Sequence, residues 1–483
     1  ARPARVGGMP RPHLTVSALA LVGLLPTAPG LAAPAPAATP ATAAVLRPGA
    51  PGAGDPYFPD MGNGGYDVSS YDIALAWNPA TKAIAATTTI KAVATQGLSR
   101  FNLDLKGLVV QSVRVGGASA AYSRSGAQEL VITPPKGIAK GASFTVAVTY
   151  KGVPKAINDP TLGRSGWVAT ADGAVALNQP FGAATYFPVN DTPRDKATYI
   201  HRITVPTGYQ VIANGEPTAP MTSGGNTTYV WKMTSPMASE LSSVAIGRYT
   251  VTTGTVAGTS IRSISAIAKS IDRTGAGARL NTATGAVVNW QRNRFGAYPF
   301  ASTGGLVAPI GVGYALEVQG RPVYDQGSPT VSTGLLAHEL AHQWFGNSVT
   351  PKQWKDIWLN EGFATYAEWL YDEAHGGPTA QQQFTAHYNS TSWTGKVADP
   401  GRDHIYDGLV YTRGALTLHA LRNRIGTATF DKLLRTWAAT YRGRNVTTAD
   451  FIATAERVSG KNLDAFFQDW LYESGKPSLR SAQ

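Results

Sequence analysis

Two histidines four residues apart enclose a glutamate in the apolar stretch TGLLAHELAHQWFG, residues 333–346. On a helix, residues i and i+4 lie on one face about one turn apart, so His338 and His342 could offer imidazole nitrogens to one ion. Glu339 lies about 100° around the helix, where it could serve as general base for a bound water. Because unpaired histidines are costly to bury, the pattern favours a zinc site over two packing histidines.

A third ligand is available in the stretch KDIWLNEGFATYAEWLY, residues 355–371. Its apolar residues recur at helical spacing, and Glu361 lies near the start of the predicted helix, with eighteen residues between it and His342. Two histidines, one glutamate and an open position form a catalytic zinc arrangement, with one ion per chain. Glu368 returns to the same helix face and could bond a ligand histidine, although a solvated helix carboxylate is an equally good interpretation. The two stretches predict a zinc hydrolase.

Composition excludes several other kinds of site. The chain has 483 residues, no cysteine and a formal net charge of +12. Without cysteine there can be no disulfide, no thiolate metal site and no cysteine nucleophile. The lysines and arginines are scattered, without a basic run or interleaved aromatic residues, so a solvated basic surface is a better interpretation than nucleic-acid binding.

The N-terminal segment has the pattern of a secretory signal. Three arginines and no acidic residue within residues 1–11 precede the apolar run 14–25, and small residues follow. This order is typical of a signal peptide, and the apolar run is too short for a membrane anchor. We therefore expect a signal peptide at 1–33, an Ala/Pro/Gly-rich linker at 34–54 and a secreted protein without a membrane anchor. The alternative is a disordered arm on a cytosolic protein.

The rest of the chain shows two different sequence patterns, one typical of strands and one typical of helices. Over residues 55–250, segments rich in Val, Thr and Ile, such as 143–150, alternate partly and are broken by Gly, Pro and Asn. This pattern predicts antiparallel sheets in a sandwich or saddle. Over residues 251–483, apolar residues recur at helical spacing and segments such as 278–296 end at glycine, which predicts a mostly helical domain. Strands followed by helices predict a two-domain α+β protein.

The zinc-site segments together resemble the aminopeptidase N-like gluzincin metallopeptidases. HELAH is followed, after the same eighteen residues as in that family, by Glu361 within WLNEGFA. Four further segments resemble family motifs: NQPFGAATYFPVNDTPRDKATY (178–199), FGAYPF (295–300), GYALEVQ (313–319) and YTRGA (411–415). The resemblance runs from about Tyr66 to about Leu479. It implies a β-saddle domain followed by a thermolysin-like, mostly α catalytic domain.

The resemblance implies the zinc ligands and general base already named, and it adds four residues. Glu317, the acid of GYALEVQ, is implied to bind the free α-amine of a substrate, with Gln179 as a second polar contact. Tyr411 is implied to donate its hydroxyl to the transition state, and Tyr406 is the neighbouring family tyrosine. For Glu317, an ordinary salt bridge to Arg321 stays open as an alternative.

Two features depart from the family pattern. Tyr314 stands where the family has glycine and Val318 where it has asparagine, so the shape of the substrate site and the geometry at the amine could differ. Almost nothing follows the segment 463–479, so we expect a short form without the family's large C-terminal helical domain.

These observations predict a secreted zinc aminopeptidase that acts on peptides with a free N-terminus. Zinc would lower the pKa of a bound water, and Glu339 would accept its proton as the water attacks a carbonyl. Two alternatives stay open: a zinc endopeptidase on the same scaffold, and a zinc-binding module without catalysis. The retained Glu317 speaks against the first and the intact Glu339 against the second.

Overall fold

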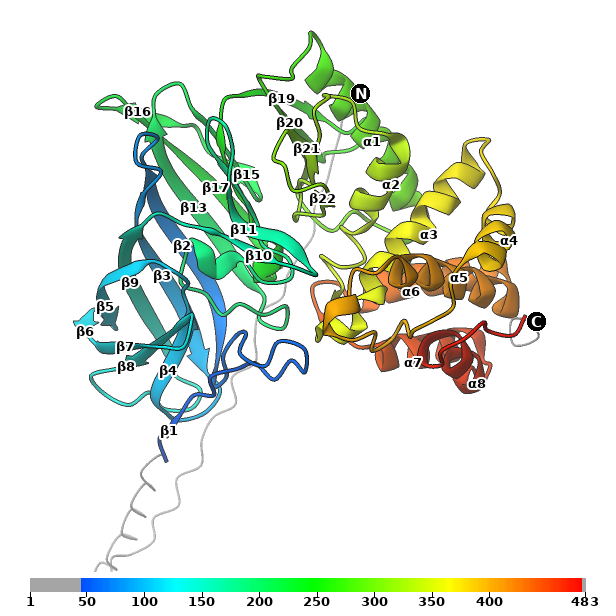
Figure 1. Cartoon of the computed structure of the whole chain (residues 1–483), viewed down its shortest axis with the longest axis horizontal. Coiled ribbons are helices and arrows are strands. Elements are labelled where there is room, and N and C mark those ends of the chain that lie inside the picture. Colours follow the sequence, from blue (N-terminus) through cyan, green and yellow to red (C-terminus); the bar gives the residue numbers. More distant parts are fainter. Residues whose placement is uncertain (1–44, 480–483) are drawn as a thin grey trace, which may run out of the picture. The chain divides into compact units, whose positions relative to one another are not determined.

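The computed structural model describes residues 45–479. An N-terminal part built of strands is followed by a part that combines a smaller sheet with several helices (Figure 1). This confirms the predicted α+β class. The predicted signal peptide, residues 1–33, lies outside the described residues. Among the helices of residues 45–479, none has the length and apolar character needed to cross a membrane.

The largest sheet of the N-terminal part has nine strands. Along β2 (Tyr66–Trp77), Ile73, Leu75 and Trp77 are buried and the residues between them are exposed, because successive side chains of a strand point to opposite faces. The other strands are β3 (Ile84–Ala94), β5 (Val109–Val115), β6 (Ala118–Ser119), β9 (Ser143–Gly152), β13 (Ala197–Pro206), β15 (Glu216–Pro217), β16 (Met221–Ser223) and β17 (Asn226–Met237). Their order is β15-β17-β13-β2-β3-β9-β5-β6, with β16 paired to β17. Pairing is antiparallel except between β13 and β2, which are parallel.

Two smaller sheets share an apolar core with the large one. The first has the order β1-β4-β8-β7 and consists of β1 (Arg47–Pro48), β4 (Leu98–Asp104), β7 (Ala121–Ser125) and β8 (Glu129–Thr133). The second has the order β10-β11-β12-β18-β14 and consists of β10 (Ala156–Asp159), β11 (Gly163–Ala169), β12 (Ala174–Leu177), β14 (Gln210–Ala213) and β18 (Val244–Gly247). Packed sheets of this kind agree with the predicted sandwich.

The end of the predicted linker 34–54 belongs to this domain. Strand β1 pairs in parallel with β4, and the amide of Gly49 donates to the carbonyl of Arg100 over 2.9 Å. The linker prediction is therefore wrong for residues 45–54, because composition does not reveal backbone hydrogen bonds to a distant strand. Residues 34–44 lie outside the described residues.

The second part combines a five-stranded sheet with helices. The sheet has the order β19-β20-β21-β23-β22 and consists of β19 (Tyr249–Thr255), β20 (Arg262–Ala268), β21 (Ser302–Ala308), β22 (Ala315–Leu316) and β23 (Val323–Asp325). The helices are α1 (Ala276–Phe295), α2 (Thr333–Ala341), α3 (Trp358–Ala374), α4 (Ala380–Ser390), α5 (Gly408–Ile425), α6 (Thr427–Thr440), α7 (Thr448–Ser459) and α8 (Asp464–Phe467). Helix α1 ends before Gly296, whose φ of 102° favours glycine, as the sequence predicts. Strands β24 (Thr350–Pro351) and β25 (Asn445–Val446) form a separate pair.

Two glycines let helices α3 and α5 approach closely. A Cβ atom added to Gly362 would lie 2.8 Å from the Cα of Gly414, and one added to Gly414 would lie 2.7 Å from the Cα of Gly362. Such distances leave no room for a side chain, so both positions need glycine. Gly362 directly follows Glu361, and Gly414 lies three residues after Tyr411. The close approach therefore brings the segments of these two candidate site residues together.

Candidate active site

The two histidines lie at the C-terminal end of the short helix α2. The Ser332 hydroxyl accepts a hydrogen bond from the amide of Leu335 at the N-terminus of the helix. The helix ends at Ala341, so His342 is its C-cap and the residues after it form turns. His342 keeps helical dihedral angles, and its amide still donates to the carbonyl of His338. The two imidazoles consequently remain on one face, one turn apart.

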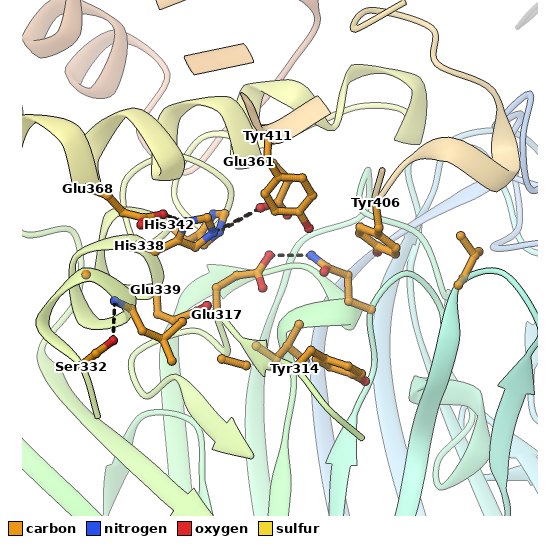
Figure 2. A pocket seen from close by; sticks show the side chains of 16 residues that line it. Tyr314, Glu317, Ser332, His338, Glu339, His342, Glu361, Glu368, Tyr406 and Tyr411 are labelled. Carbon is orange, nitrogen blue, oxygen red and sulfur yellow. Dashed lines mark hydrogen bonds and ion pairs between the residues drawn. The ribbon is translucent and has the colours of Figure 1, made fainter. Parts of the chain in front are cut away.

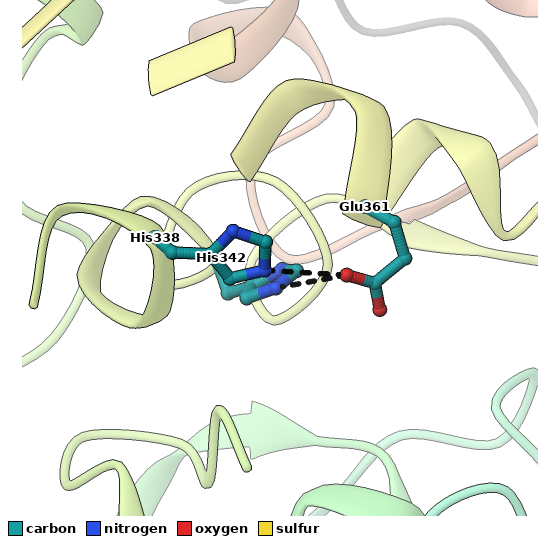
Figure 3. Close-up of side chains that lie close together, drawn as sticks. All are labelled: His338, His342 and Glu361. Carbon is teal, nitrogen blue, oxygen red and sulfur yellow. Dashed lines mark ion pairs between the residues drawn. The ribbon is translucent and has the colours of Figure 1, made fainter. Parts of the chain in front are cut away.

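His338, His342 and Glu361 meet at one point (Figure 3). The Nε2 atom of each histidine lies 3.4 Å from the Oε2 atom of Glu361, which comes from the first turn of α3. The three ligand atoms lie within 4.8 Å of one another. Two imidazole nitrogens and one carboxylate oxygen are the donors that a catalytic zinc ion takes from a protein, with one position left for water or substrate.

Further contacts hold each histidine in the orientation that metal binding requires. His338 Nδ1 lies 2.7 Å from Glu368 Oε1, and His342 Nδ1 lies 3.1 Å from the carbonyl oxygen of Phe345. Each acceptor favours a proton on Nδ1 and so leaves the Nε2 lone pair free for a metal. Of the two interpretations of Glu368 in the sequence, the structure therefore favours the contact to a ligand histidine.

We expect Glu368→Ala to weaken zinc binding by about 10- to 100-fold, because the imidazole of His338 loses the carboxylate that orients it. Competition with a coloured chelator would measure the zinc affinity. Glu373→Ala is a suitable control, since Glu373 lies on the same helix but pairs with Arg422 instead. Equal zinc affinities in Glu368→Ala and the wild type would show that the contact does not support the ligand.

The charges around this point favour a cation. Burial opposes a charge on His342, but the carboxylates of Glu317 and Glu361 raise its pKa to about 9. Burial also opposes ionisation of Glu361, but the two histidines outweigh it and lower the pKa of this carboxyl to about 2. The pocket thus attracts protons to the positions that a divalent cation would occupy, and the donor set fits zinc.

Glu339 and Glu317 face the same pocket (Figure 2). One ligand atom each of Glu317, Glu339 and His342 lies within 4.8 Å of the other two. Burial raises the pKa of Glu339 to about 7, and among residues 45–479 its Oε2 atom has no hydrogen-bond partner. A buried carboxylate oxygen without a partner, with a pKa near neutrality, is suited to accept a proton from a bound water.

Gln179 reaches Glu317 from the N-terminal part of the chain. Its Nε2 atom donates to Glu317 Oε1 over 2.6 Å, and burial raises the pKa of the Glu317 carboxyl. The alternative salt bridge to Arg321 is not formed, because that guanidinium donates to the backbone carbonyls of Ile264 and Ala213. The structure thus brings Gln179 and Glu317 together beside the metal-site residues.

The two candidate tyrosines line the same pocket, which has a volume of about 710 Å³ (Figure 2). The ring of Tyr411 is nearly parallel to the imidazole of His338, with 6.1 Å between ring centroids. Burial raises the pKa of Tyr411 well above its ordinary value, so its hydroxyl keeps its proton. The hydroxyl of Tyr406 is buried and has no hydrogen-bond partner within the described part of the chain.

Sequence reasoning missed the residues that hold Glu317 in place. The side-chain amides of Asn347 and Gln343 donate to the backbone carbonyl of Glu317 over 2.6 and 3.3 Å. Lys196 in turn donates to the backbone carbonyls of Asn347 and Ser348. The available signal was position, since Gln343 and Asn347 are the first and fifth residues after the HELAH segment and are polar residues in an apolar stretch.

Both parts of the chain match one peptidase family. Residues 328–470 match the Peptidase family M1 domain, and residues 68–241 match the Peptidase M1 N-terminal domain. The first match contains His338, His342, Glu361 and Tyr411, and the second contains Gln179.

Curated relatives share part of their length with this chain. Aminopeptidase M1-A of Oryza sativa subsp. japonica is 26% identical over 363 residues, which are 69% of this chain and 41% of the rice protein. Aminopeptidase N of Streptomyces lividans is 28% identical over 218 residues, or 40% of this chain and 25% of that protein. The chain thus spans less than half the length of these relatives.

The crystal structure of an M1 zinc metallopeptidase from Deinococcus radiodurans is similar over nearly the whole fold. It has a TM-score of 0.82 and 28% sequence identity, and the match covers 89% of this chain and 98% of that one. The matches to both domains, together with this similarity and the geometry of the metal-site residues, lead to one conclusion. The chain belongs to the aminopeptidase N-like gluzincin family of zinc metallopeptidases, peptidase family M1.

Proposed function

We propose that this protein is a zinc-dependent aminopeptidase that removes N-terminal residues from peptides. One observation carries the proposal: the carboxylate of Glu317 lies within 4.8 Å of ligand atoms of His342 and Glu339. An acidic group at that distance can hold a cationic α-amine while the first peptide carbonyl faces the metal-site residues. A related Deinococcus radiodurans structure is described as bound to Tyr-ser-ala substrate, which supports a peptide as the substrate class.

The predicted zinc ligands, Glu339 and Tyr411 have different roles in this proposal. His338, His342 and Glu361 would hold one zinc ion per chain, which supplies Lewis-acid chemistry to a carbonyl and a water when bound. Glu339 accepts the proton that the attacking water loses. Tyr411 donates a hydrogen bond to the oxygen on which negative charge develops.

Glu317 and Gln179 determine where on the peptide the cut is made. The carboxylate of Glu317 pairs with the substrate ammonium, and Gln179 restrains that carboxylate through its 2.6 Å hydrogen bond. Because the amine and the scissile carbonyl belong to the same residue, binding the amine at Glu317 selects the first peptide bond.

The test compares a free-amine peptide with its N-acetylated twin. We expect the wild type to cleave only the free peptide and to lose this activity on removal of zinc by a chelator. Glu317→Ala should lose about 2–4 kcal/mol of transition-state binding to the free peptide, measured as kcat/KM. Glu216→Ala removes an acid outside the pocket, which pairs with Arg262, and serves as the control.

Other outcomes would select a different function. Equal cleavage of both peptides by the wild type would replace the aminopeptidase with a zinc endopeptidase. Stoichiometric zinc without turnover of any peptide would leave a zinc-binding module. Metal analysis of the same preparation should find one zinc per chain.

The proposal includes secretion, which rests on the basic, apolar and small-residue order of residues 1–33. Expression of the full chain in a secreting host should release protein that lacks this segment into the medium. N-terminal sequencing of the released protein would identify the cleavage site. Retention of the intact chain inside the cells would contradict secretion.

A further inference from the structure

Tyr314 fills part of the pocket wall three residues before Glu317. Its side chain lines the pocket (Figure 2), and its hydroxyl donates to the backbone carbonyl of Arg164 over 2.6 Å. Arg164 lies on β11 of the N-terminal part, so this bond joins the residue directly before β22 to the β10–β11 hairpin. The ring is thereby fixed at its outer end.

The backbone that leads into Tyr314 is fixed as well. The carboxylate of Asp325 accepts hydrogen bonds of 2.6–3.0 Å from four consecutive amides, those of Ile310, Gly311, Val312 and Gly313. These bonds hold the loop directly before Tyr314 against β23. Because both its backbone and its hydroxyl are restrained, the Tyr314 ring is preorganised and presents the same surface to every substrate.

Two uncharged neighbours complete this end of the pocket. Leu162, in the turn between β10 and β11, and Tyr406 line it together with Tyr314. The hairpin is fastened there by a second contact, the salt bridge between Asp159 and Arg402. No lysine or arginine is among the residues between 45 and 479 that line the pocket.

The positions of Glu317 and of the metal-site residues determine which part of a bound peptide lies near Tyr314, Leu162 and Tyr406. A bound peptide must turn its first carbonyl toward His338, His342 and Glu361 and its amine toward Glu317. Figure 2 shows Tyr314 and Tyr406 on the side of Glu317 that faces away from His338 and His342. The side chain of the first residue starts from the same carbon as the amine, so a side chain that extends past Glu317 reaches the uncharged wall.

We infer that Tyr314 is a specificity-determining residue, which makes the enzyme prefer large apolar or aromatic N-terminal residues. This inference rests on the proposed aminopeptidase function. Aromatic rings prefer edge or offset contact with another ring, and an apolar side chain loses water on reaching the wall. An acidic side chain finds no cation there and meets the carboxylate of Glu317, so N-terminal Asp and Glu are rejected.

The experiment measures kcat/KM for aminoacyl 4-nitroanilides of Phe, Leu, Ala and Glu with purified holoenzyme. The wild type should prefer Phe and Leu to Ala and should leave the Glu reporter almost uncleaved. Tyr314→Ala should lower the ratio of the Phe to the Ala value by about tenfold, because the wall is lost for the large side chain only. Tyr314→Leu keeps an apolar side chain, although a shorter one, and should lower this ratio less.

A matched control is available outside the pocket. The hydroxyl of Tyr388 also donates to a backbone carbonyl, that of Pro477, so Tyr388→Phe removes a comparable hydrogen bond. It should leave the Phe to Ala ratio unchanged. The ratio is the decisive measurement because both reporters use the same metal and the same Glu339, so general damage to the site lowers both values together.

The outcomes separate this inference from the function on which it rests. An unchanged ratio in both Tyr314→Ala and Tyr314→Leu, with the reporters still cleaved, would overturn the role of Tyr314 and leave the aminopeptidase in place. Rapid cleavage of the Glu reporter by the wild type would overturn the uncharged subsite. Failure of the zinc-loaded wild type to cleave any reporter or free-amine peptide would overturn both.

Discussion

Glu339→Gln should retain zinc and lose nearly all peptide hydrolysis. The predicted zinc ligands are His338, His342 and Glu361, whose side chains meet at distances of 3.4 Å. Glu339 is not one of them, so the substitution leaves all three ligands in place. Glutamine keeps the shape of the side chain but cannot accept a proton at neutral pH. Loss of a general base of this kind should lower kcat by about 10²–10⁴-fold.

The measurement pairs zinc content with turnover on the same sample. Glu216→Gln is a useful comparison, because Glu216 also has a buried carboxylate oxygen without a hydrogen-bond partner in the described chain but lies outside the pocket. That variant should keep both zinc and activity. If Glu339→Gln instead lost its zinc, the residue would belong to the metal-binding set and another group would have to be the base.

Tyr411→Phe should lower kcat by about 10²–10³-fold with little change in KM. The hydroxyl of Tyr411 keeps its proton because burial raises its pKa well above the ordinary value, and its ring lies beside the imidazole of His338. A donor that meets charge only in the transition state affects kcat more than KM.

Tyr406→Phe is the informative comparison for this prediction. Its hydroxyl is also buried in the same pocket, and it has no hydrogen-bond partner within residues 45–479. If Tyr411 is the donor, Tyr406→Phe should have the smaller effect on kcat. A larger effect of Tyr406→Phe, with near-normal kcat in Tyr411→Phe, would reverse the assignment of the two residues.

The sequence by itself determined the features that depend on local periodicity. The i, i+4 spacing of His338 and His342 places both on one helix face in any helix, and the structure keeps this arrangement although α2 ends just before His342. Helix α1 ends where Gly296 allows a positive φ. The partial alternation over residues 143–150 predicted a strand, which the structure forms as β9. These features need no knowledge of distant parts of the chain.

The resemblance to the peptidase family supplied candidate site residues that the spacing of apolar residues along the chain could not reveal. Glu317 and Gln179 are 138 residues apart, and no local pattern predicts the 2.6 Å hydrogen bond between them. Composition likewise predicted a linker up to residue 54, whereas the backbone at Arg47 and Pro48 pairs with β4. Strand pairing depends on which distant segment supplies the matching carbonyls and amides.

Only the tertiary structure could exclude a salt bridge between Glu317 and Arg321. Arg321 is near it in sequence and of opposite charge, yet the guanidinium donates to the carbonyls of Ile264 and Ala213 on β20 and β14. The carboxylate is left with Gln179 as its partner. The contact of Tyr314 also depends on the tertiary structure. The sequence showed only that a tyrosine replaces the family glycine, whereas in the fold its hydroxyl donates to the carbonyl of Arg164, 150 residues earlier. Such contacts depend on how the sheets of the two domains meet, and side-chain spacing along the chain carries no information about that packing.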